Sequence, residues 1–344
     1  MQLKPVIASY SGDAYVRMRA FLGEDVLALI GEIARSPEAA SQAPADMLGE
    51  LIEMHVLREE GDSHRLDTSV FLRDDIAAIR EAVTPLAREL AEHVLEVGDA
   101  FKDAPAELVL FLGGIIGLVQ GLGRALQEKN VGVDWQHYGG RYARAKVDFD
   151  EVCDIYEVIG PDCLNKTILQ GERYTAVFIG PGGRTFASLG QVMYDSDESS
   201  AYARQLHRFL VDAYAELAQG RIEHTALRAA AKEVGLLRNG RLSTAVITSE
   251  VVDTYKDAID AVASAAFLYY QDSLPTLEAL LRSTTPGRQG VPPANMMMNL
   301  WRYIRKLTAR ELYASGFLRD TVPDDGVVTV FHENDVPLLR RLLL

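Results

Sequence analysis

Two stretches of the chain follow one plan: VLREEGDSHRLDTSVFLRDDIAAI at residues 56–79 and LLRNGRLSTAVITSEVVDTY at residues 236–255. Each opens with a short apolar segment, turns at a glycine, and returns through RLDTSV or RLSTAV to a helix start. Apolar residues alternate over 66–72, which is typical of a half-buried strand. The second turn is Asn239-Gly240, a strong hairpin signal because both residues tolerate positive φ. The two stretches therefore predict β-hairpins of similar construction.

A helix precedes each hairpin. The segments ADMLGELIEMH at 45–55 and TALRAAAKEV at 225–234 place apolar residues at helical spacing. A third copy near the end of the chain has the helix TARELYAS at 308–315 and the return strand VVTVF at 327–331. Thr308 opens a T-x-x-E capping box, which predicts a helix start. Side chains that could cap the following helices are Asp74 or Asp75, Thr248 or Ser249, and Asn334.

Helix, short strand, turn, return strand and helix is the sequence plan of a winged helix. ARELYASGFLRD at 309–320 resembles the junction between the recognition helix and the wing of bacterial winged-helix transcriptional regulators. The resemblance implies a mainly α fold with small β-hairpins (α+β), in which several winged-helix-like modules are joined by long helices. Unrelated hairpins in an α+β protein are the alternative.

Breaks in the pattern divide the chain. TTPGRQGVPP at 284–293 is rich in proline and glycine and predicts a linker. YTAVFIGPGGRTFASLG at 174–190 predicts two strands around a glycine-rich turn. The expected parts are a winged-helix-like domain at 1–80, a helical connector at 81–128, a central α+β domain with a hairpin at 129–220, a second winged-helix-like unit with helices at 221–283, and a C-terminal winged-helix-like domain at 290–344.

Charge limits the possible partners. The net charge is −14, and residues 1–100 hold ten more Asp and Glu than Lys and Arg. A polyanion repels nucleic acid at long range. The exposed face of helix 45–55 carries Asp46, Glu50 and Glu53, whereas a helix that reads DNA presents basic or amide side chains. The first module is therefore not expected to place this helix in a major groove.

Residues 281–310 reverse the sign, with six Lys and Arg and no acid. Along NLWRYIRKLTAR at 299–310, apolar residues share one face and basic residues fan over the rest. This predicts a surface for nucleic acid or another anion, formed by Arg302, Arg305, Lys306 and Arg310. The alternative is a solvated basic helix that pairs with the acidic N-terminal region of the same or a neighbouring chain.

Aromatic residues gather in VDWQHYGGRY at 133–142. Amphipathic aromatic side chains often line ligand pockets, so Trp135, Tyr138 and Tyr142 are candidate ligand-binding residues. Ordinary core packing is the alternative. Tyr142 and Lys146 also match the Y-x-x-x-K of short-chain dehydrogenases, but the glycine-rich turn that this chemistry needs near the N-terminus is missing.

No catalytic or metal-binding pattern is visible. The seven histidines lack H-x-x-x-H spacing and the two cysteines lack C-x-x-C spacing, so neither a metal nor a cofactor is expected. His55 is expected on the apolar face of its helix, as a core residue. With no leader and no apolar run of bilayer length, a cytoplasmic location without membrane contact is expected.

The favoured interpretation is a winged-helix regulatory protein. It would bind DNA or another anion through the basic helix, as a transcriptional regulator does, and a small-molecule effector or a partner through the central region. The first alternative is a protein-interaction scaffold built of winged helices, a homodimer or a partner complex, that does not bind DNA. The second alternative is an enzyme whose site the sequence does not reveal.

Overall fold

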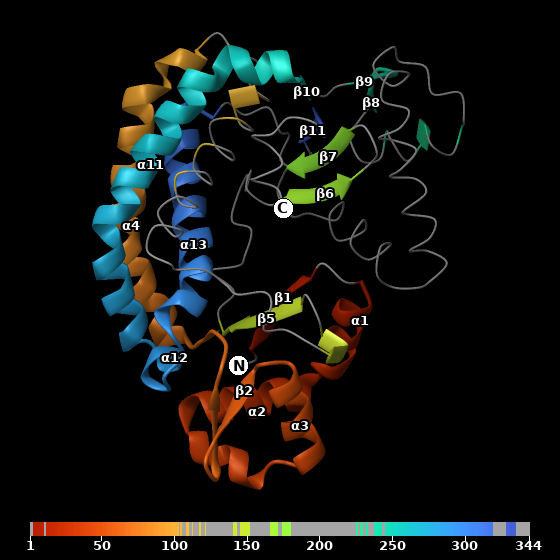
Figure 1. Cartoon of the computed structure of the whole chain (residues 1–344), viewed down its shortest axis with the longest axis vertical. Helices are drawn as coiled ribbons and strands as arrows, with labels where there is room; N and C mark the ends of the chain where they lie inside the picture. Colours follow the sequence, from red (N-terminus) through yellow and green to blue (C-terminus); the bar gives the residue numbers. More distant parts are fainter. Residues whose placement is uncertain are drawn as a thin grey trace. The chain divides into compact units, whose positions relative to one another are not determined.

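The structure is a computed structural model. It describes residues 3–9, 12–102, 140–142, 145–151, 166–170, 174–179, 237–242, 245–318 and 328–334, with single positions between 104 and 121 and between 225 and 232. Over these residues the chain is mainly helical with small strands, which confirms the α+β class (Figure 1).

The chain forms two compact units, and each draws on three separate segments. The first contains Met1–Leu86, Leu126–Glu157 and Asp272–Ile304, and the second contains Ala87–Ala125, Val158–Gln271 and Arg305–Leu344. The units are discontinuous in sequence, whereas the five ranges expected from the sequence are consecutive. None of the helices in the described part of the chain is long and apolar enough to cross a bilayer.

The first unit begins with a strand and three helices joined by a short 3-10 turn. In the second helix Val26, Leu27, Ile30 and Ile33 recur at helical spacing, and all four are buried. The elements are β1 (Lys4–Ser9), α1 (Gly12–Phe21), α2 (Glu24–Arg35), η1 (Pro37–Gln42) and α3 (Ala45–Glu53).

The last turn of α3 places His55 outside the helix. The N–H of His55 donates to Ile52 O and the N–H of Val56 donates to Leu51 O, both at 2.9 Å, the two bonds of a Schellman motif. His55 takes the left-handed position that glycine usually fills, with φ of 54°. Its side chain is 36% exposed, and Nδ1 lies 3.7 Å from Asp67 Oδ2. The expected place of His55 on the apolar helix face is therefore wrong.

The first hairpin is shorter than expected. β2 (Leu57–Glu60) and β3 (Ser63–Leu66) pair antiparallel around Gly61, whose φ is +62°. The chain then leaves the hairpin, and β4 (Val70–Phe71) pairs in parallel with β5 (Ala145–Asp150), which also pairs with β1. Residues 66–72 are thus not one strand, because the partner of β4 is a segment distant in sequence.

A long helix follows, and the expected cap is found at Asp75. The carboxylate of Asp75 accepts the N–H of Leu72 at 2.9 Å and so satisfies a free donor at the start of α4 (Arg73–Val97). The helix continues through Pro85, and the 3-10 turn η2 (Gly98–Phe101) follows it.

The segment expected to be a linker is a buried corner. α11 (Ser249–Ser283), α12 (Thr285–Arg288) and α13 (Pro293–Ala314) follow one another, and Thr284 and Val291 between them are only 2% exposed. A Cβ at Gly287 would lie 2.1 Å from Leu281 O, so the close approach of the chain requires glycine there. Glycine and proline serve a tight helix-to-helix corner here.

Gln289 fastens this corner to the N-terminal elements of the first unit. Its Nε2 donates to Ile33 O and Ala34 O, both at 3.0 Å, and its Oε1 accepts the N–H of Leu66 at 3.2 Å. Its main-chain oxygen accepts a hydrogen bond from Arg58 at 2.6 Å. One buried side chain therefore joins the end of α2, the end of β3 and the corner after α12.

The second unit contains a four-stranded sheet in the order β10-β11-β7-β6. Its strands are β6 (Lys166–Gln170), β7 (Tyr174–Ile179), β10 (Ala245–Ile247) and β11 (Val328–Glu333). β10 and β11 lie in the return segments of the second and third copies, and they pair in parallel. These two segments thus share one sheet, whereas separate wings were expected.

The strands that pair with β7 differ from the partner strand expected at residues 184–190. Both of its edges are occupied, by β6 and by β11, so its hairpin connection falls between Gln170 and Tyr174. Residues 184–190, the second strand expected there, lie outside the described residues. The Asn239-Gly240 hairpin is confirmed: β8 (Leu237–Arg238) pairs with β9 (Arg241–Leu242), and the two turn residues have φ of 54° and 77°.

The helix ends of the second unit confirm one cap and correct another. Thr248 Oγ1 accepts the N–H of Val251 at 3.4 Å, at the start of α11. Thr308, by contrast, lies inside α13 and its hydroxyl donates to Ala87 O at 3.3 Å. The prediction of a capping box at Thr308 is therefore wrong, because the helix begins fifteen residues earlier, at Pro293. Asn334 follows β11 directly.

Candidate functional site

The expected basic surface of α13 is largely buried. Arg305 is 9% exposed and Lys306 is 5% exposed, while Arg310 is exposed. The side chain of Arg302 lies outside the described residues. Because phosphate contacts need cations that reach solvent, Arg305 and Lys306 do not offer them in this structure. The helical spacing of apolar residues did not predict the burial of Arg305 and Lys306, because α13 is buried on more than its apolar face. Tyr303 and Ala309 are buried as well.

Of the candidate ligand-binding aromatic residues, only Tyr142 is among the described residues; Trp135 and Tyr138 are not. Tyr142 is 3% exposed, and its hydroxyl donates to Glu50 Oε2 at 2.7 Å. Burial and this carboxylate raise the pKa of Tyr142 to about 12. Tyr142 thus makes a structural contact with α3.

Arg141 adds a second contact on the same face of α3. This residue and Tyr142 belong to η5 (Gly140–Tyr142). The guanidinium of Arg141 lies 2.8 Å from Glu50 Oε1, and its Nε donates to Glu53 Oε1 at 2.9 Å. The hydrogen bond from Arg141 lowers the pKa of the Glu53 carboxyl. Residues 141 and 142 therefore cover part of the acidic face of α3.

A buried polar cluster lies at β5, the central strand of the three-stranded sheet. Lys146 Nζ lies 3.1 Å from Asp148 Oδ1 and donates to Asn295 O at 3.0 Å. Thr68 Oγ1 lies 2.9 Å from the same Asp148 oxygen. Lys146 and Asp148 are each at least 95% buried, so their charges compensate each other inside the protein. Lys146 and Tyr142 have different partners, which gives no support to dehydrogenase chemistry.

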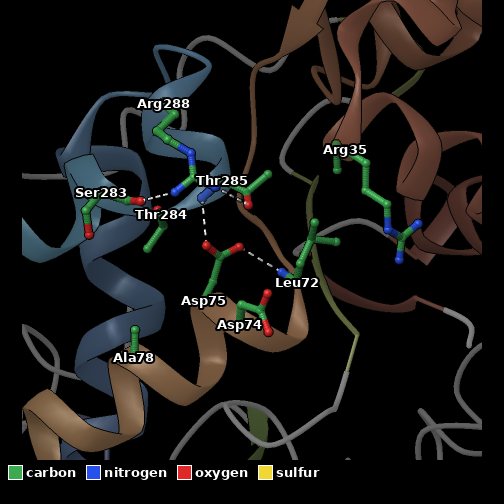
Figure 2. Close-up of a pocket in the computed structure, with 10 residues that line it drawn as sticks. Arg35, Leu72, Asp74, Asp75, Ala78, Ser283, Thr284, Thr285 and Arg288 are labelled. Atoms are coloured by element: carbon green, nitrogen blue, oxygen red, sulfur yellow. Dashed lines mark hydrogen bonds between the residues drawn. The ribbon is translucent and has the colours of Figure 1, made fainter.

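The first unit contains a solvent-connected cavity of about 460 Å³. It lies between the end of α2, the start of α4 and the corner formed by α11 and α12 (Figure 2). Seven of its ten lining residues have charged or hydroxyl side chains. They are Arg35, Asp74, Asp75, Ser283, Thr284, Thr285 and Arg288.

Asp75 joins two walls of this cavity. It is 5% exposed, and its two carboxylate oxygens accept the N–H groups of Leu72 at 2.9 Å and Thr285 at 2.8 Å (Figure 2). The same side chain therefore caps α4 and holds the start of α12. Hydrogen bonds to a carboxylate from backbone N–H groups are among the stronger ones in proteins. The two walls of the cavity are therefore joined at Asp75.

Arg35 has a carboxylate partner. Its Nη2 donates to Glu151 Oε1 at 2.8 Å, and its Nη1 donates to Gly31 O at 3.1 Å. The other oxygen of Glu151 accepts the N–H of Arg73 at 3.0 Å. The charge of Arg35 is thus compensated by Glu151, next to the first turn of α4.

Arg288 and Asp74, unlike Arg35, have no oppositely charged partner among the described residues. Arg288 donates to Ser283 O and, at 3.1 Å, to Thr285 Oγ1, and both of these acceptors are uncharged. Asp74 is exposed and has neither a hydrogen bond nor an ion pair with any residue in the described ranges. The cavity therefore carries one cation and one carboxylate whose charges have no partner among the described residues.

Only part of this site was predictable from the sequence. Asp74 and Asp75 were expected as helix caps, and 284–293 was expected as a linker. No local signal identified Arg35 and Arg288 as neighbours of one cavity, because the contact between Asp75 and Thr285 spans 210 positions.

Within the described residues, no three His, Cys, Asp or Glu side chains form a metal-binding group. Comparisons with protein-family models, curated proteins and solved structures found no match to this chain.

Proposed function

We propose that the chain is a protein-interaction scaffold whose N-terminal module, residues 24–66, is winged-helix-like and does not bind DNA. The order of elements supports this: α2, η1 and α3 are followed directly by the β2–β3 hairpin. This is the helix-to-wing plan that the sequence resembles.

One observation carries the choice of a scaffold over a DNA reader. The helix α3, which would be the recognition helix, holds Arg141 and Tyr142 on its acidic residues Glu50 and Glu53. A major-groove helix must be free and must present donors to bases and phosphates. This helix presents carboxylates, and two of them, Glu50 and Glu53, are already bound from within the chain, while Asp46 is exposed.

The wing supports the same choice. Glu59, Glu60 and Asp62 are exposed on and next to the β2–β3 turn. Glu60 pairs with Arg65 of the same hairpin, so Glu59 and Asp62 are the carboxylates that would repel a phosphate backbone and suit a basic protein surface. We therefore infer that the partner presents Lys and Arg side chains to this wing.

The DNA-binding regulator is the second candidate. The surplus of six positive charges over residues 281–310 favours it. The burial of Arg305 and Lys306 leaves it with Arg310 and with Arg302, whose side chain is not described.

Charge reversal tests the scaffold. The triple change Glu59→Lys, Glu60→Lys and Asp62→Lys is compared with the change of Glu92, Glu96 and Asp99 to Lys, three other exposed acids. Affinity capture from the source cells, read by mass spectrometry, is expected to lose one partner only with the wing variant. An unchanged set of partners in both variants contradicts the proposal.

A further inference from the structure

The cavity of the first unit has the dimensions of a small-molecule site. Its volume of about 460 Å³ falls within the range of roughly 300–1,000 Å³ that ligand pockets occupy. Its walls come from α2, α4, α11 and α12, and the bond from Thr285 N–H to Asp75 holds α12 to α4. This bond fixes α12 against α4 before a ligand enters, which lowers the entropic cost of ordering that part of the wall.

The cavity wall carries equal numbers of positive and negative side chains, but these side chains do not pair with one another. Two arginines and two aspartates line the cavity. Arg35 is compensated by Glu151, and Asp75 accepts two backbone N–H groups. Arg288 and Asp74 are left, one of each sign, and Figure 2 draws them on different helices, α12 and α4.

Arg288 keeps hydrogen-bonding capacity for a ligand. A guanidinium has five N–H donors, and Arg288 uses two contacts to hold Ser283 O and Thr285 Oγ1. These contacts orient the group, and its remaining donors suit a carboxylate. Asp74 offers only acceptors when ionised, which suits an ammonium group.

The geometry points to a binding site for a small zwitterion of the amino-acid class. Its carboxylate is bound by Arg288 and its ammonium group by Asp74. A purely anionic ligand would satisfy Arg288 alone and would be repelled by the two aspartates, and a purely cationic ligand would satisfy Asp74 alone. Such a ligand joins α4 to α12 beside the Asp75–Thr285 bond. This cavity site is distinct from the aromatic ligand site that the sequence predicted at residues 133–142.

Isothermal titration calorimetry of the full chain tests this with the twenty protein amino acids as probes. Each is titrated to about 10 mM, because a weak site with Kd near 1 mM is then detected. At least one amino acid is expected to bind. Acetate and methylammonium, which each carry only one of the two charges, are expected to bind at least about tenfold more weakly, the loss of one charge-assisted contact.

Two variants locate the site. Asp74→Asn changes an exposed side chain that has no partner among the described residues, so the fold is expected to be retained, and Kd is expected to rise about tenfold or more. Arg288→Gln is also expected to raise Kd about tenfold or more. Arg282→Gln changes an exposed arginine that does not line the cavity and is expected to bind as the unaltered chain does. Absence of binding by all twenty amino acids, unchanged affinity in Asp74→Asn, or equal affinity for acetate overturns the proposal.

Discussion

Replacing Gln289 by Met tests whether the corner after α12 holds the first unit together. Methionine matches the length of glutamine but neither donates nor accepts a strong hydrogen bond. The change removes the two bonds to Ile33 O and Ala34 O and the bond from Leu66 N–H. Three bonds at about 1 kcal/mol each, together with a stranded buried N–H at Leu66, predict a loss of about 3–5 kcal/mol in the free energy of unfolding.

Urea denaturation followed by circular dichroism measures this loss, and hydrogen exchange of the peptide that contains Leu66 locates it. Faster exchange at the end of β3 is expected, because the N–H of Leu66 loses its acceptor. Gln42→Met is the matched control, since Gln42 is exposed on η1 and a change below about 0.5 kcal/mol is expected there. A loss below about 1 kcal/mol for Gln289→Met, or unaltered exchange, refutes the role given to this side chain.

Three further predictions concern single positions. His55→Gly is expected to raise the free energy of unfolding by about 1 kcal/mol, because glycine adopts the φ of 54° without strain; no gain in urea resistance contradicts this. Gly287→Ala is expected to destabilise by about 1–3 kcal/mol, because its Cβ meets a backbone oxygen at 2.1 Å, whereas Gly49→Ala, with open space in α3, is expected to stabilise by about 0.5–1 kcal/mol; equal effects in thermal melts contradict this. Tyr142 has a folded pKa of about 12 against an ordinary value of 10.0, so its stabilising contribution is complete below pH 10 and is lost as the pH rises from 10 through 12. Tyr142→Phe is expected to reduce that alkaline loss, and identical alkaline unfolding curves of the two chains contradict this.

Local signals predicted local features well. The Asn239-Gly240 turn formed the expected hairpin, because a two-residue turn of this kind depends on the φ preferences of its own residues. The caps at Asp75 and Thr248 formed for the same reason, since each bonds an N–H three positions away. The acidic face of α3 was also visible in the spacing of its residues.

The pairing of strands that are distant in the sequence could not be predicted from local patterns. The strand β4 does not extend the β2–β3 hairpin and pairs instead with β5, more than seventy residues further on. β10 and β11, about eighty residues apart, likewise pair with each other. A pattern of alternating residues shows that a segment suits a sheet and does not show which sheet it joins.

The same limit applies to the sites. Proline and glycine at 284–293 predicted a linker, yet they form a buried corner because Gln289 finds four partners in the N-terminal elements. Arg305 and Lys306 looked like a basic surface, because helical spacing cannot show that a helix is buried on more than one side.

The most direct test of the proposed scaffold is fluorescence anisotropy of the full chain with a labelled mixed-sequence DNA duplex, measured at several salt concentrations. A chain of net charge −14, with an acidic and covered α3, is expected to show no binding with Kd below about 100 μM near 0.15 M salt, the weak end of the range for non-specific binding. Micromolar or tighter binding that weakens steeply with salt, and that is lost when Arg302 and Arg310 are changed to Ala, would contradict the scaffold and favour the DNA-binding regulator.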